Sequence, residues 1–246
     1  PEQHMAHVAM AIPETGMRRI DDDTVVSPKS FEAAMHAIGA VNAAVDAVFK
    51  GEADNAFVAS RPPGHHAETS TAMGFCLFNH IAIAARHAQK VHGAERIAII
   101  DWDVHHGNGT QDIFWSDPSV LYCSTHQFPL YPGTGALNET GTKNNIVNAP
   151  LAPQTGSETF REAFETRILP SLEKFRPDLV LISAGFDAHT RDPLADINLE
   201  EDDFDWATGK LMEVAGRHAS NRLVSLLEGG YDLKGMSLSA AAHVAR

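Results

Sequence analysis

The stretch from Ile97 to Thr110 holds the residue types of this chain that are best suited to chemistry. It opens with an apolar run rich in isoleucine, which is typical of a buried strand, and acids and imidazoles follow at once. If the extended backbone continues, the side chains of Asp101, Asp103 and His105 all point to one side. Two carboxylates and an imidazole suit a divalent metal ion. The alternative is a solvated turn; we favour the metal site, because Asp and His seldom cluster behind a buried strand without a ligand.

Three other predicted strands also end in polar residues. His65-His66, Asp187 and Tyr231 each come after a short apolar run and lie within two residues of a glycine. Each has an ordinary explanation on its own: a surface pair, a helix N-cap and a packing aromatic. In open α/β sheets, however, ligands bind beyond the carboxyl ends of the strands. The shared placement therefore predicts one site assembled from distant parts of the chain.

Such a site favours metal-assisted hydrolysis. The metal would keep positions open for water and a substrate carbonyl, a histidine would accept a proton, and a tyrosine would stabilise the oxyanion. A serine hydrolase is disfavoured because the chain has no Gly-x-Ser-x-Gly motif. Gly107-Asn108-Gly109 lacks the remaining residues of a phosphate-binding loop.

Alternating helices and strands must position these residues. Periodicity and turn residues predict helices over 28–50, 77–91, 109–115, 160–175 and 199–215, and strands over 56–59, 97–101, 120–124, 146–149, 179–183 and 223–227. We expect Pro170 to kink the fourth helix and Gly216 to end the fifth. Residues 1–26 show little periodicity, and Asp21 to Asp23 is interpreted as a solvated turn. Strands that are apolar throughout imply a mostly parallel sheet with helices on both faces.

Composition restricts the class of protein. The 246 residues are long enough for one large α/β domain, 1–246, and 32 acidic against 19 basic residues argue against nucleic-acid binding. We interpret the acidity as ordinary solubility charge rather than as steering of a cationic substrate. The two cysteines form no CxxC pair, no leader precedes them, and no apolar run approaches the roughly 20 residues of a membrane span, so we expect a cytoplasmic protein without membrane contact. Because the chain begins at Pro1 and ends at Arg246 inside a helical pattern, we expect a fragment that lacks terminal segments. The sequence leaves a homo-oligomer open.

The linked motifs resemble those of the zinc-dependent histone deacetylase family. They are Arg61-Pro62-Pro63-Gly64-His65-His66, Gly74-Phe75-Cys76, Asp101 to Thr110, Ser183 to Asp187 and Glu228-Gly229-Gly230-Tyr231. Trp102, Asn108 and Glu228 are similar to the class II branch, which includes bacterial deacetylase-like and acetylpolyamine amidohydrolases. The resemblance implies the three-layer arginase/deacetylase fold.

The resemblance also implies a role for each site residue. It makes Asp103, His105 and Asp187 the zinc ligands, with Fe²⁺ as an alternative ion. His66 would be the general base, Asp101 would orient His65, and Tyr231 would donate to the oxyanion. Asn108 departs from class I, in which an Asp contacts the second histidine, and a neutral partner should leave His66 less basic.

The resemblance further implies a narrow substrate tunnel and a second ion. Its lining would be Gly74, Phe75, Tyr131 and Leu194, with Tyr131 where many relatives carry Phe. A structural K⁺ or Na⁺ would be held by Asp101, Asp103, His105 and Ser124.

Substrate choice depends on Leu194. Polyamine-preferring relatives tend to carry an acid there, so Leu194 favours an acylated lysine in a protein or peptide over an acetylated polyamine. The chemistry implied is removal of acetyl or another short acyl group by metal-activated water. The alternatives are acetylpolyamine hydrolysis and a catalytically silent acyl-lysine binding module, which would have no need of Tyr231 or both histidines.

Overall fold

The computed structural model describes residues 1–246 and alternates helices with parallel strands. In chain order the elements are α1 (Glu2–Ala11), β1 (Arg18–Arg19), β2 (Val25–Val26), α2 (Ser30–Lys50), β3 (Asn55–Val58), α3 (His80–His92), β4 (Ile97–Asp101), α4 (Asn108–Phe114), β5 (Val120–Gln127), β6 (Ile146–Leu151), α5 (Ser157–Ala163), the π-helix η1 (Phe164–Ile168), α6 (Leu169–Phe175), β7 (Leu179–Ala184), α7 (Glu201–His218), β8 (Leu223–Leu227) and α8 (Leu233–Ala245).

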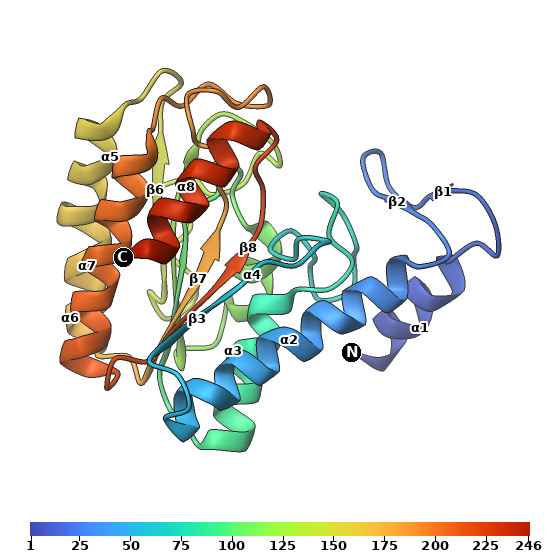
Figure 1. Ribbon diagram of the computed structural model, residues 1–246, viewed down its shortest axis with the longest axis horizontal. Helices are drawn as coiled ribbons and strands as arrows, with labels where there is room; N and C mark the ends of the chain where they lie inside the picture. The colour runs from blue at the N-terminus through green and yellow to red at the C-terminus, as the bar shows by residue number, and fades with distance from the viewer.

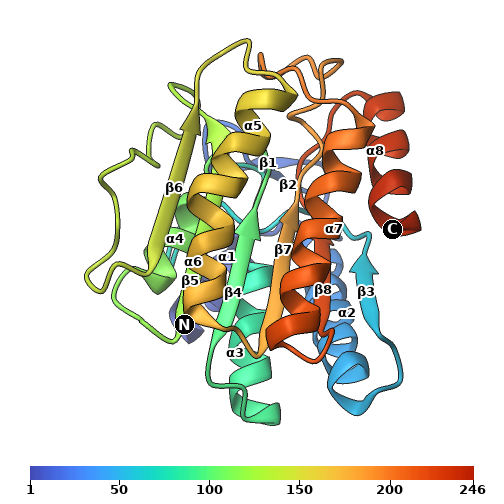
Figure 2. The same ribbon diagram turned by 90° about the vertical axis from the view of Figure 1, so that its left-hand side faces the viewer.

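The main sheet has six strands in the order β3-β8-β7-β4-β5-β6, and every neighbouring pair is parallel. Strands β4, β5 and β7 are buried along their whole length, because helices cover both faces. Helices α5, α6 and α7 lie over one face (Figure 2), and α2 and α3 lie over the other (Figure 1). The predicted three-layer arrangement is confirmed.

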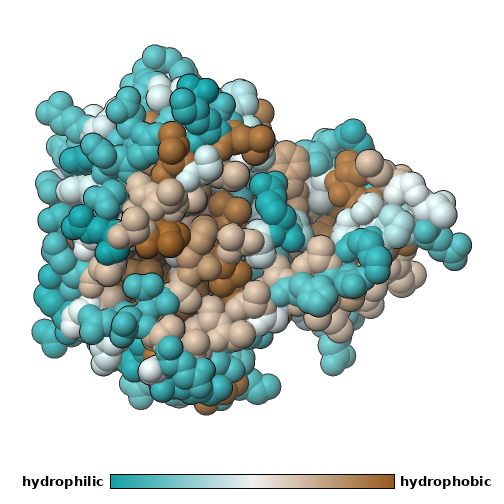
Figure 3. Space-filling model, in the orientation of Figure 1, coloured by the Kyte–Doolittle hydropathy of each residue, from teal (hydrophilic) through white to brown (hydrophobic).

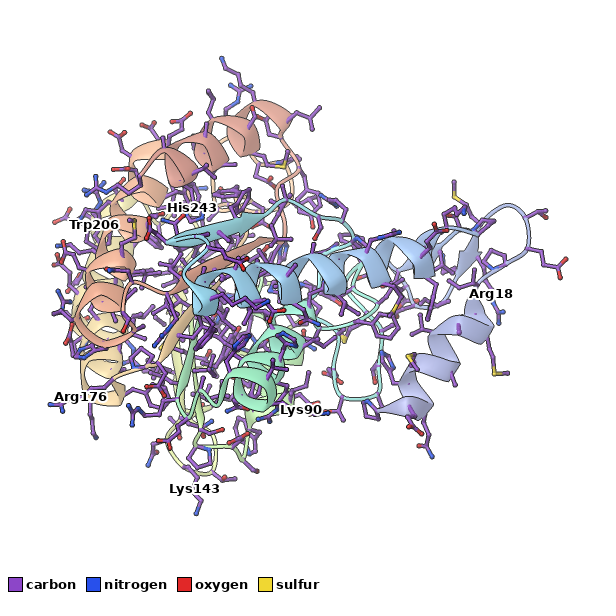
Figure 4. The ribbon with its side chains drawn as sticks, turned by 60° about the horizontal axis from the view of Figure 1, so that its bottom comes forward. Arg18, Lys90, Lys143, Arg176, Trp206 and His243 are labelled. Carbon is purple, nitrogen blue, oxygen red and sulfur yellow. The ribbon has the colours of Figure 1, made fainter.

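Helix α8 is fixed to the sheet by a buried histidine. His243 lies 2.7 Å from the hydroxyl of Ser225 on β8 through Nε2 and 2.6 Å from that of Thr208 on α7 through Nδ1. Figure 4 labels His243 at the sheet side of α8 and Trp206 at the outer side of the molecule. Burial lowers the pKa of His243 to about 4, so the imidazole is neutral at pH 7 and joins the two hydroxyls without a buried charge.

The first 26 residues hold more structure than their sequence pattern predicts. Helix α1 buries His4, Val8 and Ala11, whose spacing forms one narrow stripe. The two-residue strands β1 and β2 pair in antiparallel fashion. Together they form the end of the molecule farthest from α5–α7, where Figure 4 labels Arg18.

The structure tests two predictions about helix regularity. The π-helical turn η1 lies directly before Pro170, which cannot donate the next helical hydrogen bond, so the predicted irregularity is present at this place. The predicted end at Gly216 is wrong. Helix α7 continues beyond Gly216 to His218. Its C-cap is Ala219, whose backbone N–H donates to the carbonyl of Ala215.

Two strand boundaries also differ from prediction. Strand β4 ends at Asp101, so the extended backbone does not continue through the motif as assumed. Strand β5 runs on to Gln127, beyond the predicted end at residue 124, and includes His126, because residues 122–127 pair with β6. Both changes place polar side chains at the carboxyl edge of the sheet.

None of the helices combines the length and apolar character that a bilayer span requires. One face of the molecule nevertheless shows apolar side chains gathered between α2 and α8 (Figure 3). Leu233, Leu238 and Val244 of α8 are among the exposed large apolar residues.

Candidate active site

The predicted site residues come together beyond the carboxyl ends of four strands. The segment that carries His65 and His66 follows β3, Asp103 and His105 follow β4, and Asp187 follows β7. Tyr231 follows β8. Because these four strands are parallel, their carboxyl ends lie at one edge of the sheet, which brings residues 65 and 231 to the same place.

Asp103, His105 and Asp187 form a compact buried cluster. Each offers one donor atom, and the three atoms all lie within 4.8 Å of one another. His105 Nδ1 is 3.3 Å from an oxygen of Asp103 and 3.0 Å from one of Asp187. One nitrogen and two oxygens suit Zn²⁺ or Fe²⁺ and leave coordination positions for substrate or water.

Hydrogen bonds from backbone N–H groups orient the carboxylates of Asp103 and Asp187 within this cluster. Asp103 accepts from the N–H of His105 at 2.9 Å and of Gly229 at 2.8 Å, and Asp187 accepts from that of Val104 at 2.9 Å. A Cβ at Gly229 would collide with the carboxylates of both Asp103 and Asp187, so only glycine allows this approach. The residues present therefore fit a divalent cation.

The cluster holds protons that a metal ion must displace. Burial opposes the charge on His105, but Asp103 and Asp187 outweigh it and raise its pKa to about 10; burial and then Asp103 raise the pKa of Asp187 to about 7. At pH 7 the imidazole is thus protonated and Asp187 partly so, whereas metal ligands must be deprotonated.

We expect Zn²⁺ binding to the metal-free protein at pH 7 to release roughly one to two protons. The apparent affinity should rise from pH 6 to pH 8, because protons compete less as the pH approaches the pKa of His105. Titration calorimetry in two buffers of different ionisation enthalpy measures the release. An affinity independent of pH, with no proton release, would contradict this assignment.

His65 and His66 lie beside the cluster with their rings 4.0 Å apart. Nδ1 of His65 donates to Asp101 at 3.0 Å, and its Nε2 is 3.8 Å from Asp103. Nδ1 of His66 lies 2.9 Å from the side-chain oxygen of Asn108. The predicted contacts of both histidines are therefore present.

The two histidines differ in their electrostatic surroundings. Burial disfavours a charge on His65, but the carboxylates of Asp101, Asp103 and Glu228 raise its pKa well above the usual 6.5. Burial, and then the charge of His65, lower the pKa of His66 well below 6.5. At neutral pH, His66 is thus the one that can accept a proton.

Tyr231 completes the site from the loop after β8. Its ring centroid is 6.1 Å from that of Phe75, and its backbone N–H donates to Asp192 at 2.7 Å. The carboxylate of Asp192 is buried and also accepts from the N–H of Leu194 at 3.0 Å. Asp192 therefore holds the Tyr231 loop instead of offering a surface charge.

Two residues of the predicted tunnel lie beside this site, Phe75 near Tyr231 and Tyr131 near His66, where we expect its entrance. Phe75, Tyr131 and Leu194 are exposed aromatic and apolar side chains, at 40%, 38% and 46%. The ring of Tyr131 lies 5.2 Å from that of His66. Gly74 has a φ of 59°, and a Cβ there would strike the His66 ring, which explains the need for glycine.

Asp23 contributes to this entrance, although its triplet of acids was interpreted as a solvated turn. Its side chain accepts from the backbone N–H of Gly74 at 3.0 Å, while the hydroxyl of Thr24 accepts from that of Phe75 at 3.1 Å. Burial, followed by the charges of Asp23 and Asp21, raises the pKa of Tyr131. No local pattern signals this role, because about 50 residues separate the two loops.

Glu228 is a second residue whose role the sequence did not show. Its buried carboxylate accepts from the N–H of Gly64 at 2.7 Å, from that of His65 at 3.2 Å and from the hydroxyl of Ser183 at 3.1 Å. Burial is the main cause that raises its pKa to about 7. The motif marks Glu228 as unusual, since an acid seldom ends a buried strand, but gives no indication of its partner.

The residues predicted to hold a monovalent cation lie next to one another at the ends of two strands. Asp101 and Ser124 are direct neighbours on the paired strands β4 and β5. Asp101 accepts from the N–H of Asp103 at 3.1 Å and from the Tyr122 hydroxyl at 3.1 Å. Ser124 lies 2.8 Å from a nitrogen of His126. The monovalent-cation site therefore stays a prediction.

A second His/Asp group lies elsewhere, where α2 and α3 meet. One oxygen of Asp46 is 2.7 Å from Nε2 of both His87 and His92. Lys50 lies 3.8 Å from the other oxygen, and the group is only half-buried. A neighbouring ammonium disfavours a bound cation, so we assign this group to the packing of the two helices.

The sheet, the edge at which the site lies and the donor set together define an α/β protein with a candidate metal-dependent hydrolytic centre. The chain belongs to the histone deacetylase domain family, whose model matches residues 2–246. The resemblance stated from the motifs is confirmed.

Individual relatives agree with this membership. The chain is 43% identical over 235 residues to a histone deacetylase-like amidohydrolase of Pseudomonas aeruginosa, covering 93% of this chain and 62% of that protein. It is 48% identical over 226 residues to an uncharacterized protein of Synechocystis, and the match covers 92% of this chain and 72% of that protein. The crystal structure of the HDA15 HD domain matches with a TM-score of 0.93 at 39% identity, covering 99% of this chain and 69% of that one. The arginase/deacetylase fold is thereby confirmed.

Proposed function

We propose that this chain is the catalytic domain of a metal-dependent amidohydrolase that removes acetyl or other short acyl groups from Nε-acyl-lysine side chains. The observation that carries the proposal is the convergence of a buried Asp–His–Asp donor set with two histidines and a tyrosine. Family membership supports the deacetylase chemistry. A silent binding module would not need Tyr231 or both histidines.

Asp103, His105 and Asp187 would hold the ion, which we propose to be Zn²⁺, with Fe²⁺ as the alternative. A divalent ion in this position supplies Lewis acidity to the substrate carbonyl and lowers the pKa of water. The protein's own groups provide the remaining chemistry.

His66 acts as general base and then as general acid. Its neutral imidazole accepts the proton of the attacking water and later returns it to the leaving lysine amine, so that a carboxylic acid and an amine are formed. His65, held by Asp101, keeps a positive charge beside the developing oxyanion. Tyr231 donates its hydroxyl proton in a hydrogen bond to that oxyanion.

The residues of the predicted tunnel select the substrate. Gly74, Phe75 and Tyr131 admit a slender acyl-lysine chain, and the apolar Leu194 contacts the peptide around it. An acetylated polyamine keeps a free cationic amine at its other end, which the exposed Leu194 does not pair with. The test is to compare kcat/KM on an acetyl-lysine peptide and on acetylputrescine with zinc-loaded protein. Activity on neither substrate would refute the proposal, and a preference for acetylputrescine would favour the polyamine alternative.

Leu194→Glu is expected to shift this preference. One exposed charge pair contributes up to about 1 kcal/mol, so kcat/KM for acetylputrescine relative to the peptide should rise about fivefold. Leu194→Gln has nearly the same size without the charge and should leave the ratio close to that of the wild type. If the two variants shift the ratio equally, charge at this position does not select the substrate.

A further inference from the structure

Asn108 forms a bridge between His66 and Glu68. Its side-chain oxygen lies 2.9 Å from Nδ1 of His66, and its side-chain nitrogen donates to a carboxylate oxygen of Glu68 at 2.8 Å. The same nitrogen lies 3.3 Å from the sulfur of Met73. Both neighbours of the nitrogen are acceptors only, because neither a carboxylate nor a thioether carries a proton to donate.

This arrangement decides which end of the amide faces the histidine. The oxygen and the NH₂ group of an asparagine are nearly the same size, so packing alone does not distinguish them. Glu68 requires the NH₂ group, which leaves the oxygen for Nδ1 of His66. Since that oxygen can only accept, neutral His66 carries its proton on Nδ1, and Nε2 keeps a free lone pair.

The backbone around Glu68 is fixed relative to Asn108. Asn108 is the first residue of α4, and one turn later Asp112 accepts from the N–H and the hydroxyl of Thr69 at 3.0 and 2.7 Å. The N–H of Glu68 donates to Thr71 at 2.9 Å. Glu68 thus meets Asn108 from a loop tied to the same helix. His65 needs no such residue, because both oxygens of its partner Asp101 are acceptors.

We propose that Glu68 is a positioning residue that acts through Asn108 to hold His66 in the Nδ1–H tautomer. The inference deepens the proposed function, because only this tautomer leaves Nε2 able to accept a proton from water. An amide turned the other way would present NH₂ to Nδ1 and move the imidazole proton to Nε2, which blocks the base. Glu68 itself touches neither the substrate nor the metal cluster.

The test combines three variants in zinc-loaded protein. Glu68→Ala removes the acceptor and is expected to lower kcat about tenfold with KM within twofold, because general-base catalysis contributes about 10²–10⁴-fold and only part of the population loses the tautomer. Glu68→Gln keeps the size of the side chain but can present either an oxygen or an NH₂ group, so it no longer fixes the amide and should lose part of the rate, less than Glu68→Ala. In an Asn108→Asp background, Glu68→Ala should cost nothing or raise the rate, since an aspartate has no NH₂ group to orient and would be repelled by Glu68.

A second readout does not depend on activity. Two-bond ¹H–¹⁵N spectra of ¹⁵N-histidine-labelled protein report the tautomer of His66, whose signals are assigned by their loss in His66→Gln. Wild type should show Nδ1–H, and Glu68→Ala should show a fraction of Nε2–H. An unchanged tautomer in Glu68→Ala, or an equal loss of kcat in both backgrounds, would overturn the proposal. Inactive wild type with the expected tautomer change would refute the proposed function but not this role of Glu68.

Discussion

Tyr231→Phe is expected to lower kcat on an acetyl-lysine peptide by about 10²–10³-fold, the usual cost of losing one oxyanion donor. Burial, and then the carboxylates of Asp103 and Asp187, raise the pKa of Tyr231, so its hydroxyl stays protonated and able to donate. No protein group hydrogen-bonds this hydroxyl, which leaves it free for the substrate. KM should change little, because the interaction strengthens only as charge develops in the transition state.

The substitution Tyr231→Phe isolates the role of the hydroxyl, because it removes that group alone. The contact between the ring and Phe75 and the backbone bond to Asp192 both remain possible. Metal content and melting temperature should therefore equal those of the wild type, and they serve as the controls. A loss of less than tenfold in kcat with the metal retained would show that Tyr231 is not the oxyanion donor.

Asp187→Asn is expected to abolish both metal binding and turnover. One oxygen of Asp187 accepts from the N–H of Val104 at 2.9 Å, and the other faces His105 at 3.0 Å. Asn keeps the first bond through its oxygen and turns an NH₂ group toward the ion, so the loop should fold while a ligand and a negative charge are lost. Metal affinity should fall by more than about 100-fold, beyond the effect of removing an outer partner of a ligand.

Asp46→Asn is the matched control for this experiment. It makes the same substitution in the second His/Asp group, which offers one carboxylate and two imidazoles instead of two carboxylates and one imidazole and lies beside Lys50. Elemental analysis after dialysis should find about one zinc per chain in wild type and in Asp46→Asn, and much less in Asp187→Asn. Zinc lost from Asp46→Asn and kept by Asp187→Asn would move the metal site to α2 and α3.

Most of the sheet could be predicted from the sequence because its strands are apolar runs bounded by Gly, Pro and polar residues. Five of the six predicted strands have their first residue where the structure has it, as at Ile97 of β4 and Leu223 of β8. Helix α1 was missed because its buried stripe has only three small or polar members. Strand β5 was predicted too short because its last residues, His126 and Gln127, are polar and become buried only through pairing with β6.

The sequence alone determined which residues form the candidate site and which strand each of them follows. Alternating apolar and turn segments specify parallel strands, and parallel strands bring their carboxyl ends to one edge. For this reason Asp103, His105 and Asp187 could be named together. These inferences need only local pattern and a general rule of sheet geometry.

The tertiary structure decided which groups hold the named residues in place. Glu68, Asp192 and Glu228 are acids whose type suggests surface charge, and each instead accepts hydrogen bonds from the site: from Asn108, from the N–H of Tyr231 and from that of His65. Such contacts join residues 39 to 163 positions apart, and their hydrogen bonds depend on distances of about 3 Å. No periodicity encodes a spacing of that kind, so only the folded chain reveals it.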